Sequence, residues 1–326
     1  MFISRTLGAL AVIAFAQIAI ADPLPSWNDT DTRTRIIAFV EDVSDPASGN
    51  FVPAADRIAV FDNDGTLWGE QPAYFQLIFA LDRLREMAAA DPSIITSTTV
   101  QAAVDGDMNT LLAGGEKALI EIVNITHSGL PVDEFQNIVR RWLSEARHPE
   151  TGLPYDQMTY QPMVELLRYL RDEGFTTYIV SGGGVHFMRA FTEKAYGIPT
   201  RQIIGSLGET TYDVIDGVPT VTKADGIAFI DDKDTKPVAI DRTIGQRPIF
   251  AAGNSDGDFA MVQWVTAGDG PRFGMIVHHT DGVREFAYDR DSHIGKLEKG
   301  LDEGPDMGWL IVDMAKDWAR VYTGQR

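Results

Sequence analysis

The fold can be read from the stretch Arg57-Ile58-Ala59-Val60-Phe61-Asp62-Asn63-Asp64-Gly65-Thr66. Its first half is a short apolar run, which is typical of a buried parallel strand. The run ends abruptly in two carboxylates that are separated by one residue, and a glycine follows them. In open α/β sheets, ligands bind at the carboxyl ends of the strands. The stretch therefore predicts a parallel sheet with a polar site at one edge.

Later apolar segments repeat the pattern of a strand followed by a helix. Strands are expected at 175–180, 202–207, 248–252 and 273–277, and helices at 30–43, 162–174, 185–196 and 236–244. Asp216-Gly217 predicts the turn of a β-hairpin over 213–221. Repeated strand–helix units imply a parallel sheet with right-handed crossovers. We therefore expect an α/β fold, a Rossmann-like sheet with helices on both of its faces.

The segment between the first two strands has a different pattern. It lacks β-branched alternation and shows amphipathic helical spacing over 73–90, 116–125 and 132–146. We interpret it as a helical cap inserted into the sheet domain at residues 68–154. Residues 22–67 and 155–326 are then expected to form the α/β core.

Two further polar clusters follow later predicted strands. Ser181-Gly182-Gly183-Gly184 offers a hydroxyl and bare main-chain amides, which can hold a phosphoryl oxygen. Asn254-Ser255-Asp256-Gly257-Asp258 offers oxygen atoms that suit Mg²⁺. Lys236 can neutralise charge among carboxylates and a bound phosphate. Because the carboxyl ends of parallel strands meet at one edge, we expect these clusters to converge near Asp62.

Each cluster taken alone has a simpler explanation. Turns of Asp, Asn and Gly are common, and Lys236 by itself fits a solvated lysine at a helix start. A calcium loop is excluded, because Leu67 and Phe259 occupy the position that needs glycine. The sequence contains no Walker P-loop and no dinucleotide fingerprint, and Ile179 stands where a serine-hydrolase elbow needs its first glycine. The convergence of three clusters is what favours a catalytic site.

Composition narrows the classes of partner and chemistry. The 326 residues carry a formal charge of −19, with 47 acidic and 28 basic side chains, and this charge would repel nucleic acid. A small phosphorylated molecule can still bind where a metal reverses the local field. The chain has no cysteine, which excludes disulfides, thiolate nucleophiles and iron–sulfur clusters.

The N-terminus has the pattern of a signal peptide. Arg5 precedes an apolar run from Leu7 to Ile20, and Ala19-Ile20-Ala21 fits a cleavage site. The run is short for a membrane span. We therefore expect residues 1–21 to be removed on export to the periplasm or the medium, which would leave no stable membrane anchor.

The order and spacing of the polar clusters resemble those of the haloacid dehalogenase superfamily of phosphohydrolases. The matching segments are Phe61-Asp62-Asn63-Asp64-Gly65-Thr66-Leu67, Ile179-Val180-Ser181-Gly182-Gly183, Lys236-Pro237 and Gly253-Asn254-Ser255-Asp256-Gly257-Asp258. The resemblance extends over about 56–277. The helical insertion and the later hairpin are similar to those of its phosphoserine phosphatase-like branch.

The resemblance implies a role for each matching residue. Asp62 would attack phosphorus and form an aspartyl phosphate, and Asp64 would protonate the leaving alcohol and then activate water. Ser181 and the main-chain amides of Gly182 and Gly183 would hold the phosphoryl group, and Lys236 would balance charge, with Lys233 in reserve. Mg²⁺ would bind Asp62, the main-chain carbonyl of Asp64, Asn254 and Asp258.

One position departs from the family's pattern. Asn254 stands where an aspartate is usual, so its amide oxygen could ligate Mg²⁺ only without a charge. Trp68 and Glu70, just past the first motif, are expected to line the substrate pocket, although packing explains Trp68 equally well. His278 and His279 are expected to mark the end of a strand.

Taken together, these features predict a Mg²⁺-dependent phosphomonoesterase acting on a small phosphate ester in the exported compartment. Two alternatives stay open at this point. One is phosphotransfer to an alcohol on the same fold. The other is a protein that binds a phosphate ester but has impaired turnover because of Asn254.

Overall fold

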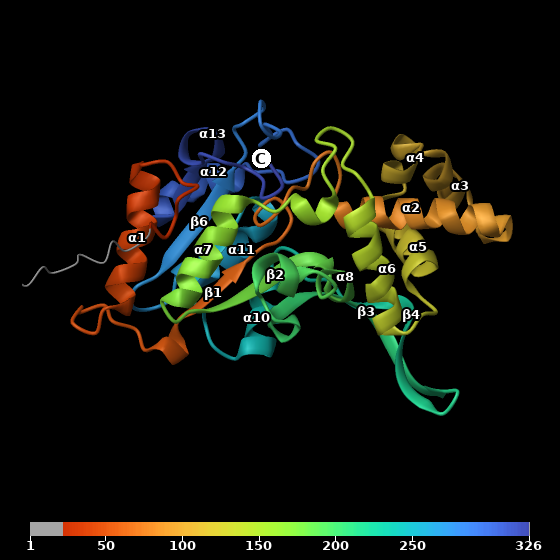
Figure 1. Ribbon diagram of the computed structural model, residues 1–326, viewed down its shortest axis with the longest axis horizontal. Coiled ribbons are helices and arrows are strands. Elements are labelled where there is room, and N and C mark those ends of the chain that lie inside the picture. The colour runs from red at the N-terminus through yellow and green to blue at the C-terminus, as the bar shows by residue number, and fades with distance from the viewer. Residues whose placement is uncertain (1–21, 326) are drawn as a thin grey trace, which may run out of the picture.

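The structure is a computed structural model that describes residues 22–325. The expected signal peptide, residues 1–21, lies outside the described residues. The strands are β1 Ile58–Phe61, β2 Thr176–Gly184, β3 Ile203–Ile215, β4 Val218–Phe229, β5 Phe250–Gly253, β6 Phe273–His278 and β7 Leu310–Asp313. They form one seven-stranded sheet in the order β4-β3-β2-β1-β5-β6-β7 (Figure 1). All neighbouring pairs are parallel except β3 and β4.

The sheet lies between helices, as the strand–helix pattern predicts. The longer helices of the core are α1 Asp31–Ser44, α7 Gln161–Asp172, α10 Thr235–Ile244 and α11 Phe259–Thr266; the shorter ones are α8 Val185–Met188, α9 Thr192–Tyr196, α12 Lys299–Glu303 and α13 Met314–Asp317. Successive residues of β1 belong to different hydrophobic clusters, since Phe61 packs with α1 and α7 whereas Val60 packs with α10 and α11. This alternation confirms the Rossmann-like sheet with helices on both faces.

The register of β1 with its neighbours places the polar clusters together. Phe61 pairs with Ile179 of β2 on one side and with Ala252 of β5 on the other. Strand β1 therefore ends level with the residues that precede the Ser181 and Asn254 clusters. The carboxyl edge of the sheet is where all three meet.

The expected cap segment contains helices and no strand of the sheet. Its helices are α2 Phe75–Ala90, α3 Thr98–Asp105, α4 Met108–Ala113, α5 Gly115–His127 and α6 Val132–Glu145. They gather at one end of the molecule (Figure 1), and several of them share a separate hydrophobic cluster that includes Leu84 and Ile122. None of the helices within residues 22–325 is apolar over a length that would cross a lipid bilayer.

The β3–β4 hairpin differs most from its expected size. The turn at Asp216-Gly217 is confirmed, with φ of 51° and 81° at its two residues, but the arms extend over 203–229 rather than 213–221. The hairpin projects beyond the sheet towards the cap helices (Figure 1). It is joined there to the loop between α5 and α6, because Lys223 N donates to Leu130 O at 2.9 Å and Gly129 N donates to Lys223 O at 2.8 Å.

Two other elements depart from the sequence expectations. The helix expected over 185–196 is divided into α8 and α9, because Phe191 leaves the helical region at φ −133° and stacks on Trp68. Strand β7 was not expected, since its four residues are too short to give a clear periodic signal. Both differences reflect tertiary packing rather than local propensity.

Candidate active site

Asp62 is held at the end of β1 by the sheet itself. Its main-chain N donates to Ala252 O at 2.9 Å, and the side chain is 6% exposed. The chain then turns sharply, with Gly65 at φ +70° and Leu67 N donating to Asn63 O at 2.8 Å. Glycine accepts this left-handed conformation without steric cost. The turn leaves both Asp62 and Asp64 facing the cavity described below.

Lys236 is a buried part of the site rather than a solvated lysine. Its Nζ donates to Asp62 Oδ1 at 2.6 Å, to Asp258 Oδ1 at 2.5 Å and to Val180 O at 3.1 Å. Burial alone would lower the pKa of Lys236, but Asp258 and Asp62 outweigh it and raise that pKa. The ammonium is therefore charged at any pH at which the protein folds, and it neutralises part of the charge around Asp62. Lys233, the reserve candidate, is exposed beside Asp232.

The two carboxylates of the first motif have different surroundings. Burial raises the pKa of Asp62, Asp258 adds to that rise, and Lys236 opposes it. Burial also raises the pKa of Asp64, while a hydrogen bond from Trp68 Nε1 to Asp64 Oδ1, 2.8 Å long, lowers it. Asp62 thus has a cationic partner that favours its ionised form, and Asp64 has only a neutral donor. This asymmetry is what a nucleophile beside a general acid requires.

The Ser181 cluster lies against the first cap helix. Gly183 N donates to Ser181 Oγ at 3.1 Å, and Gly184 N donates to Gln76 Oε1 of α2 at 2.8 Å. A Cβ placed on Gly183 would lie 3.6 Å from Asp64 Oδ2, which shows how closely the two motifs approach. Ser181 and the three glycines all line the cavity together with Asp62.

Asn254 and Asp258 close the third side of the site. Asp258 Oδ2 accepts hydrogen bonds from the main-chain N of Asn254 and Ser255, at 3.0 and 3.1 Å, so this carboxylate shapes its own loop as well as holding Lys236. Asn254 Oδ1 accepts from Thr66 Oγ1 at 3.1 Å, and its Nδ2 donates to Glu70 Oε1 at 2.6 Å. The amide therefore connects the third cluster to the first.

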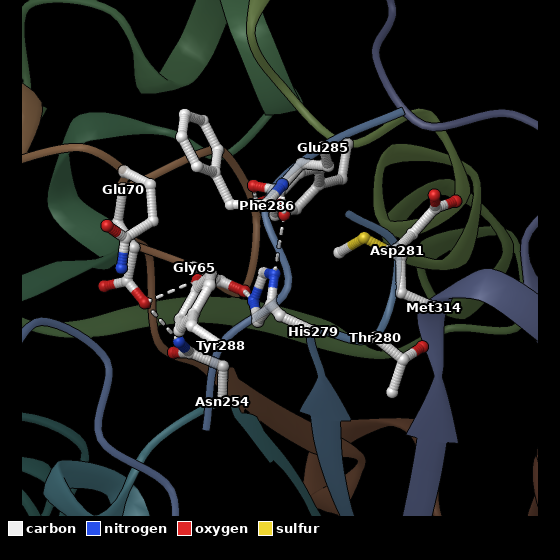
Figure 2. A network of polar contacts seen from close by, with 12 residues as sticks. Gly65, Glu70, Asn254, His279, Thr280, Asp281, Glu285, Phe286, Tyr288 and Met314 are labelled. Carbon is white, nitrogen blue, oxygen red and sulfur yellow. Dashed lines mark hydrogen bonds and ion pairs between the residues drawn. The ribbon is translucent and has the colours of Figure 1, made fainter. Parts of the chain in front are cut away.

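Glu70 is a buried carboxylate that lies beside this amide. Its Oε1 also accepts from Tyr288 Oη at 2.8 Å (Figure 2). Burial raises the pKa of Glu70, and the charges of Asp64 and Asp62 contribute to the rise. Glu70 lines the cavity, as expected, but one oxygen is occupied by Asn254 and Tyr288.

The donor set fits a divalent cation. Asp62, Asp64, Asp258 and Glu70 are buried together, and Lys236 is the one ammonium that the described residues place among them. Within 22–325, no three carboxylate or imidazole side chains are arranged as a ready metal site. A cation here would therefore depend on the Asp62 carboxylate together with the Asp64 main-chain carbonyl and the Asn254 amide oxygen, all hard oxygen ligands.

The cavity above the site has a volume of about 440 Å³ and extends from the catalytic carboxylates into the cap. Its cap side is formed mainly by apolar side chains, among them Leu77, Ile122 and Phe135. Three polar side chains on this side, His127, His186 and Lys223, were not identified from the sequence. No local motif marks them, because they come from α5, α8 and β4 and meet only in the folded chain.

Trp68 differs from the sequence expectation. It is 1% exposed, stacks on Phe191 with ring centroids 4.5 Å apart, and is not part of the cavity wall. Its contact with the site is the hydrogen bond to Asp64. Trp68 therefore orients the second carboxylate, and we correct the expectation that it lines the pocket.

A second network supports the first motif from behind. His279 Nε2 lies 2.8 Å from Gly65 O, and His279 Nδ1 lies 3.2 Å from Glu285 Oε2 (Figure 2). Both partners are acceptors, so the ring donates through both nitrogens. His279 follows β6 as expected, but it also fixes the carbonyl of Gly65. The sequence offered the adjacent His278-His279 pair as a signal, without a partner that would have revealed this role.

Comparison with known proteins agrees with this arrangement. The family described as haloacid dehalogenase-like hydrolase matches residues 59–263, which is more than half of the chain. No curated protein is significantly similar in sequence.

Solved structures support the same fold. The structure of a conserved functionally unknown protein from Anaerococcus prevotii DSM 20548 is similar with a TM-score of 0.53 and 16% identity, over 80% of this chain and 89% of that chain. A protein with unknown function from Bordetella pertussis Tohama I gives 0.48 and 18%, over 79% and 98%. A phosphoserine phosphohydrolase-like protein from Francisella tularensis subsp. tularensis SCHU S4 gives 0.41 and 16%, over 80% and 97%.

Proposed function

Since this chain belongs to the haloacid dehalogenase-like hydrolase family, we propose that it is a phosphatase that hydrolyses monophosphate esters through Asp62. The observation that carries the proposal is the buried pair of Asp62 and Asp64 on one cavity, with Lys236 bonded to the first and not to the second. A site that only bound a phosphate ester would not need a second acid with raised pKa beside the nucleophile.

In the first step, a carboxylate oxygen of Asp62 attacks phosphorus. A P–O bond to Asp62 forms, the bond to the ester oxygen breaks, and its electron pair stays on the leaving oxygen. Asp64 donates a proton to that oxygen, so the product leaves as a neutral alcohol. The Ser181 hydroxyl and the main-chain amides of Gly182 and Gly183 bind the phosphoryl oxygens, because these groups line the same cavity.

In the second step, water attacks the phosphorus of the aspartyl phosphate. Asp64, now a carboxylate, takes a proton from that water. The P–O bond to Asp62 breaks and restores the carboxylate, with inorganic phosphate as the product. Lys236 stays paired with Asp62 and Asp258 throughout and limits the build-up of negative charge.

The reaction as proposed includes Mg²⁺, held by Asp62, the main-chain carbonyl of Asp64 and Asn254. A bound Mg²⁺ would offset the charge of the phosphoryl oxygens and of the buried carboxylates. Asp258 bonds the main chain of its own loop and Lys236, so it acts on the cation through Asn254. Glu70 adds a negative charge close to the uncharged Asn254 amide.

The proposal is tested with residues 22–326 purified and assayed on p-nitrophenyl phosphate, with Mg²⁺ or with EDTA. We expect metal-dependent release of phosphate that falls at least about a thousandfold in Asp62→Asn. In Lys236→Ala the loss should be similar, whereas Lys233→Ala, a matched change at the exposed lysine nearby, should retain activity. Turnover that survives Asp62→Asn would refute the mechanism, and tight phosphate-ester binding without turnover in the wild type would favour a binding protein.

A further inference from the structure

Lys223 is the polar group of the cavity that the reaction leaves unused. It lies on β4, is 6% exposed and lines the cavity on its cap side. Its Nζ lies 3.4 Å from His186 Nδ1 and 4.8 Å from the centre of the Phe135 ring. No carboxylate among the described side chains lies within ion-pair distance of it.

An ammonium in this position is costly for the free protein. Burial lowers the pKa of Lys223 to about 8, so the side chain still carries its charge at neutral pH. The two histidines beside the cavity do not compensate, because burial lowers the pKa of His186 to about 4 and that of His127 to about 3, which leaves both rings neutral. A buried charge without a partner is normally paired when the protein works.

The surroundings of Lys223 are held in place. Its main-chain N and O are bonded to the loop between α5 and α6. His127 Nδ1 lies 2.7 Å from Thr126 Oγ1, and its Nε2 lies 3.3 Å from Gln76 Nε2. Thr126 Oγ1 donates to Ile122 O, so it accepts from His127 Nδ1–H, and Nε2 accepts from Gln76. Gln76 in turn accepts from Gly184 N, which connects this side of the cavity to the Ser181 cluster.

We propose that Lys223 binds a carboxylate on the leaving group, so that the substrate is the phosphate ester of an apolar hydroxy acid. This inference rests on the proposed function and names the substrate class of the same site. Asp62 and Lys236 lie at one end of the cavity, Lys223 lines its cap side, and apolar side chains such as Leu77 and Ile122 lie along it. A single ammonium balances the one charge of a carboxylate, whereas a second phosphate would carry close to two.

The test compares phosphate monoesters of ω-hydroxy carboxylic acids, with spacers of two to five methylene groups, with the matching carboxamides. The amide is an internal reference, because it keeps the shape of the leaving group and removes its charge. In the wild type we expect kcat/KM for the best carboxylate to exceed that of its amide by about tenfold to a hundredfold. In Lys223→Met that ratio should fall to about one, and in Lys117→Met, a change at the exposed lysine of α5, it should stay as in the wild type.

A ratio that Lys223→Met leaves unchanged would overturn the inference. If the wild type hydrolyses none of the esters, the proposed function fails first, and the carboxylate site is then measured by binding. The free hydroxy acids should raise the Tm of the wild type and not that of Lys223→Met. Equal shifts in both proteins, or no shift in either, would overturn the inference independently of catalysis.

Discussion

Asn254 determines how much negative charge faces a metal at the candidate site. Its Nδ2 donates to Glu70 Oε1, so an aspartate in its place would bring two carboxylates together. We expect Asn254→Asp to lower Tm in EDTA, and to raise Tm more steeply with Mg²⁺ than the wild type does, because a cation would relieve that repulsion. Thermal unfolding across a Mg²⁺ titration measures both effects.

The double variant Asn254→Asp, Glu70→Gln is the matched control for this prediction. The glutamine restores an amide donor between positions 70 and 254, so the loss of Tm in EDTA should be reversed. An identical Mg²⁺ response of Asn254→Asp and the wild type would show that residue 254 does not contact the metal.

Lys223 makes a second prediction, which concerns stability against pH. Its pKa is lowered to about 8 in the folded chain, from 10.5 for an ordinary lysine, so the unfolded chain binds more protons between these values. The wild type should therefore gain stability as pH rises through this window, while below pH 8 the burial of the charge costs about 2 kcal/mol. His127 and His186, which face Lys223, are neutral throughout the window.

We expect Lys223→Met to be more stable than the wild type at pH 7 and to lose that advantage towards pH 10. Urea denaturation at several pH values measures the difference. A constant difference between the two proteins across pH would contradict the assigned shift.

At the scale of elements, the loop after β6 supports the loop after β1. His279→Ala would leave the Gly65 carbonyl and the Glu285 carboxylate buried without their donor, at a cost of about 3 kcal/mol. We expect a lower free energy of unfolding together with a lower kcat, because the turn that holds Asp62 and Asp64 loses its support. His278→Ala is the control, since that ring is partly exposed and bonds only Asp289. Equal effects of the two substitutions would rule out a positioning role for His279.

The elements of the core were largely readable from local patterns. Buried parallel strands such as β1 are short apolar runs with an abrupt polar end, and the Asp216-Gly217 turn has its own backbone chemistry. The length of the hairpin arms was not readable, because most of their outer residues are exposed and lack a buried face that would fix a period. The division between α8 and α9 depends on Phe191 stacking on Trp68, a contact between distant parts of the chain.

At the scale of the whole molecule, the segment that follows the expected signal peptide is part of the core. Ser26 N and Oγ both donate to Glu165, at 2.8 and 2.7 Å, and Trp27 packs edge-on against Trp318. We propose export with cleavage after Ala21, which would remove the apolar run and leave this packing intact. Mass spectrometry of protein expressed from the full chain should find Asp22 as the first residue in the periplasmic or secreted fraction. A chain that keeps residues 1–21 and stays in the cytoplasm would contradict export.

The sequence by itself determined the α/β class, the helical insertion and the convergence of Asp62, Asp64, Ser181, Lys236 and Asn254. It could do so because each follows from a local signal: a strand that ends in polar residues, a helical period, or a glycine turn. Tertiary structure decided what no local signal encodes. It paired Lys236 with both Asp62 and Asp258, turned Trp68 away from the cavity, and brought Lys223 from a distant hairpin onto the cap side of the cavity. The physical reason is that burial and charge pairing depend on which segments meet in space, and residues such as Lys223 gain their chemistry only from those neighbours.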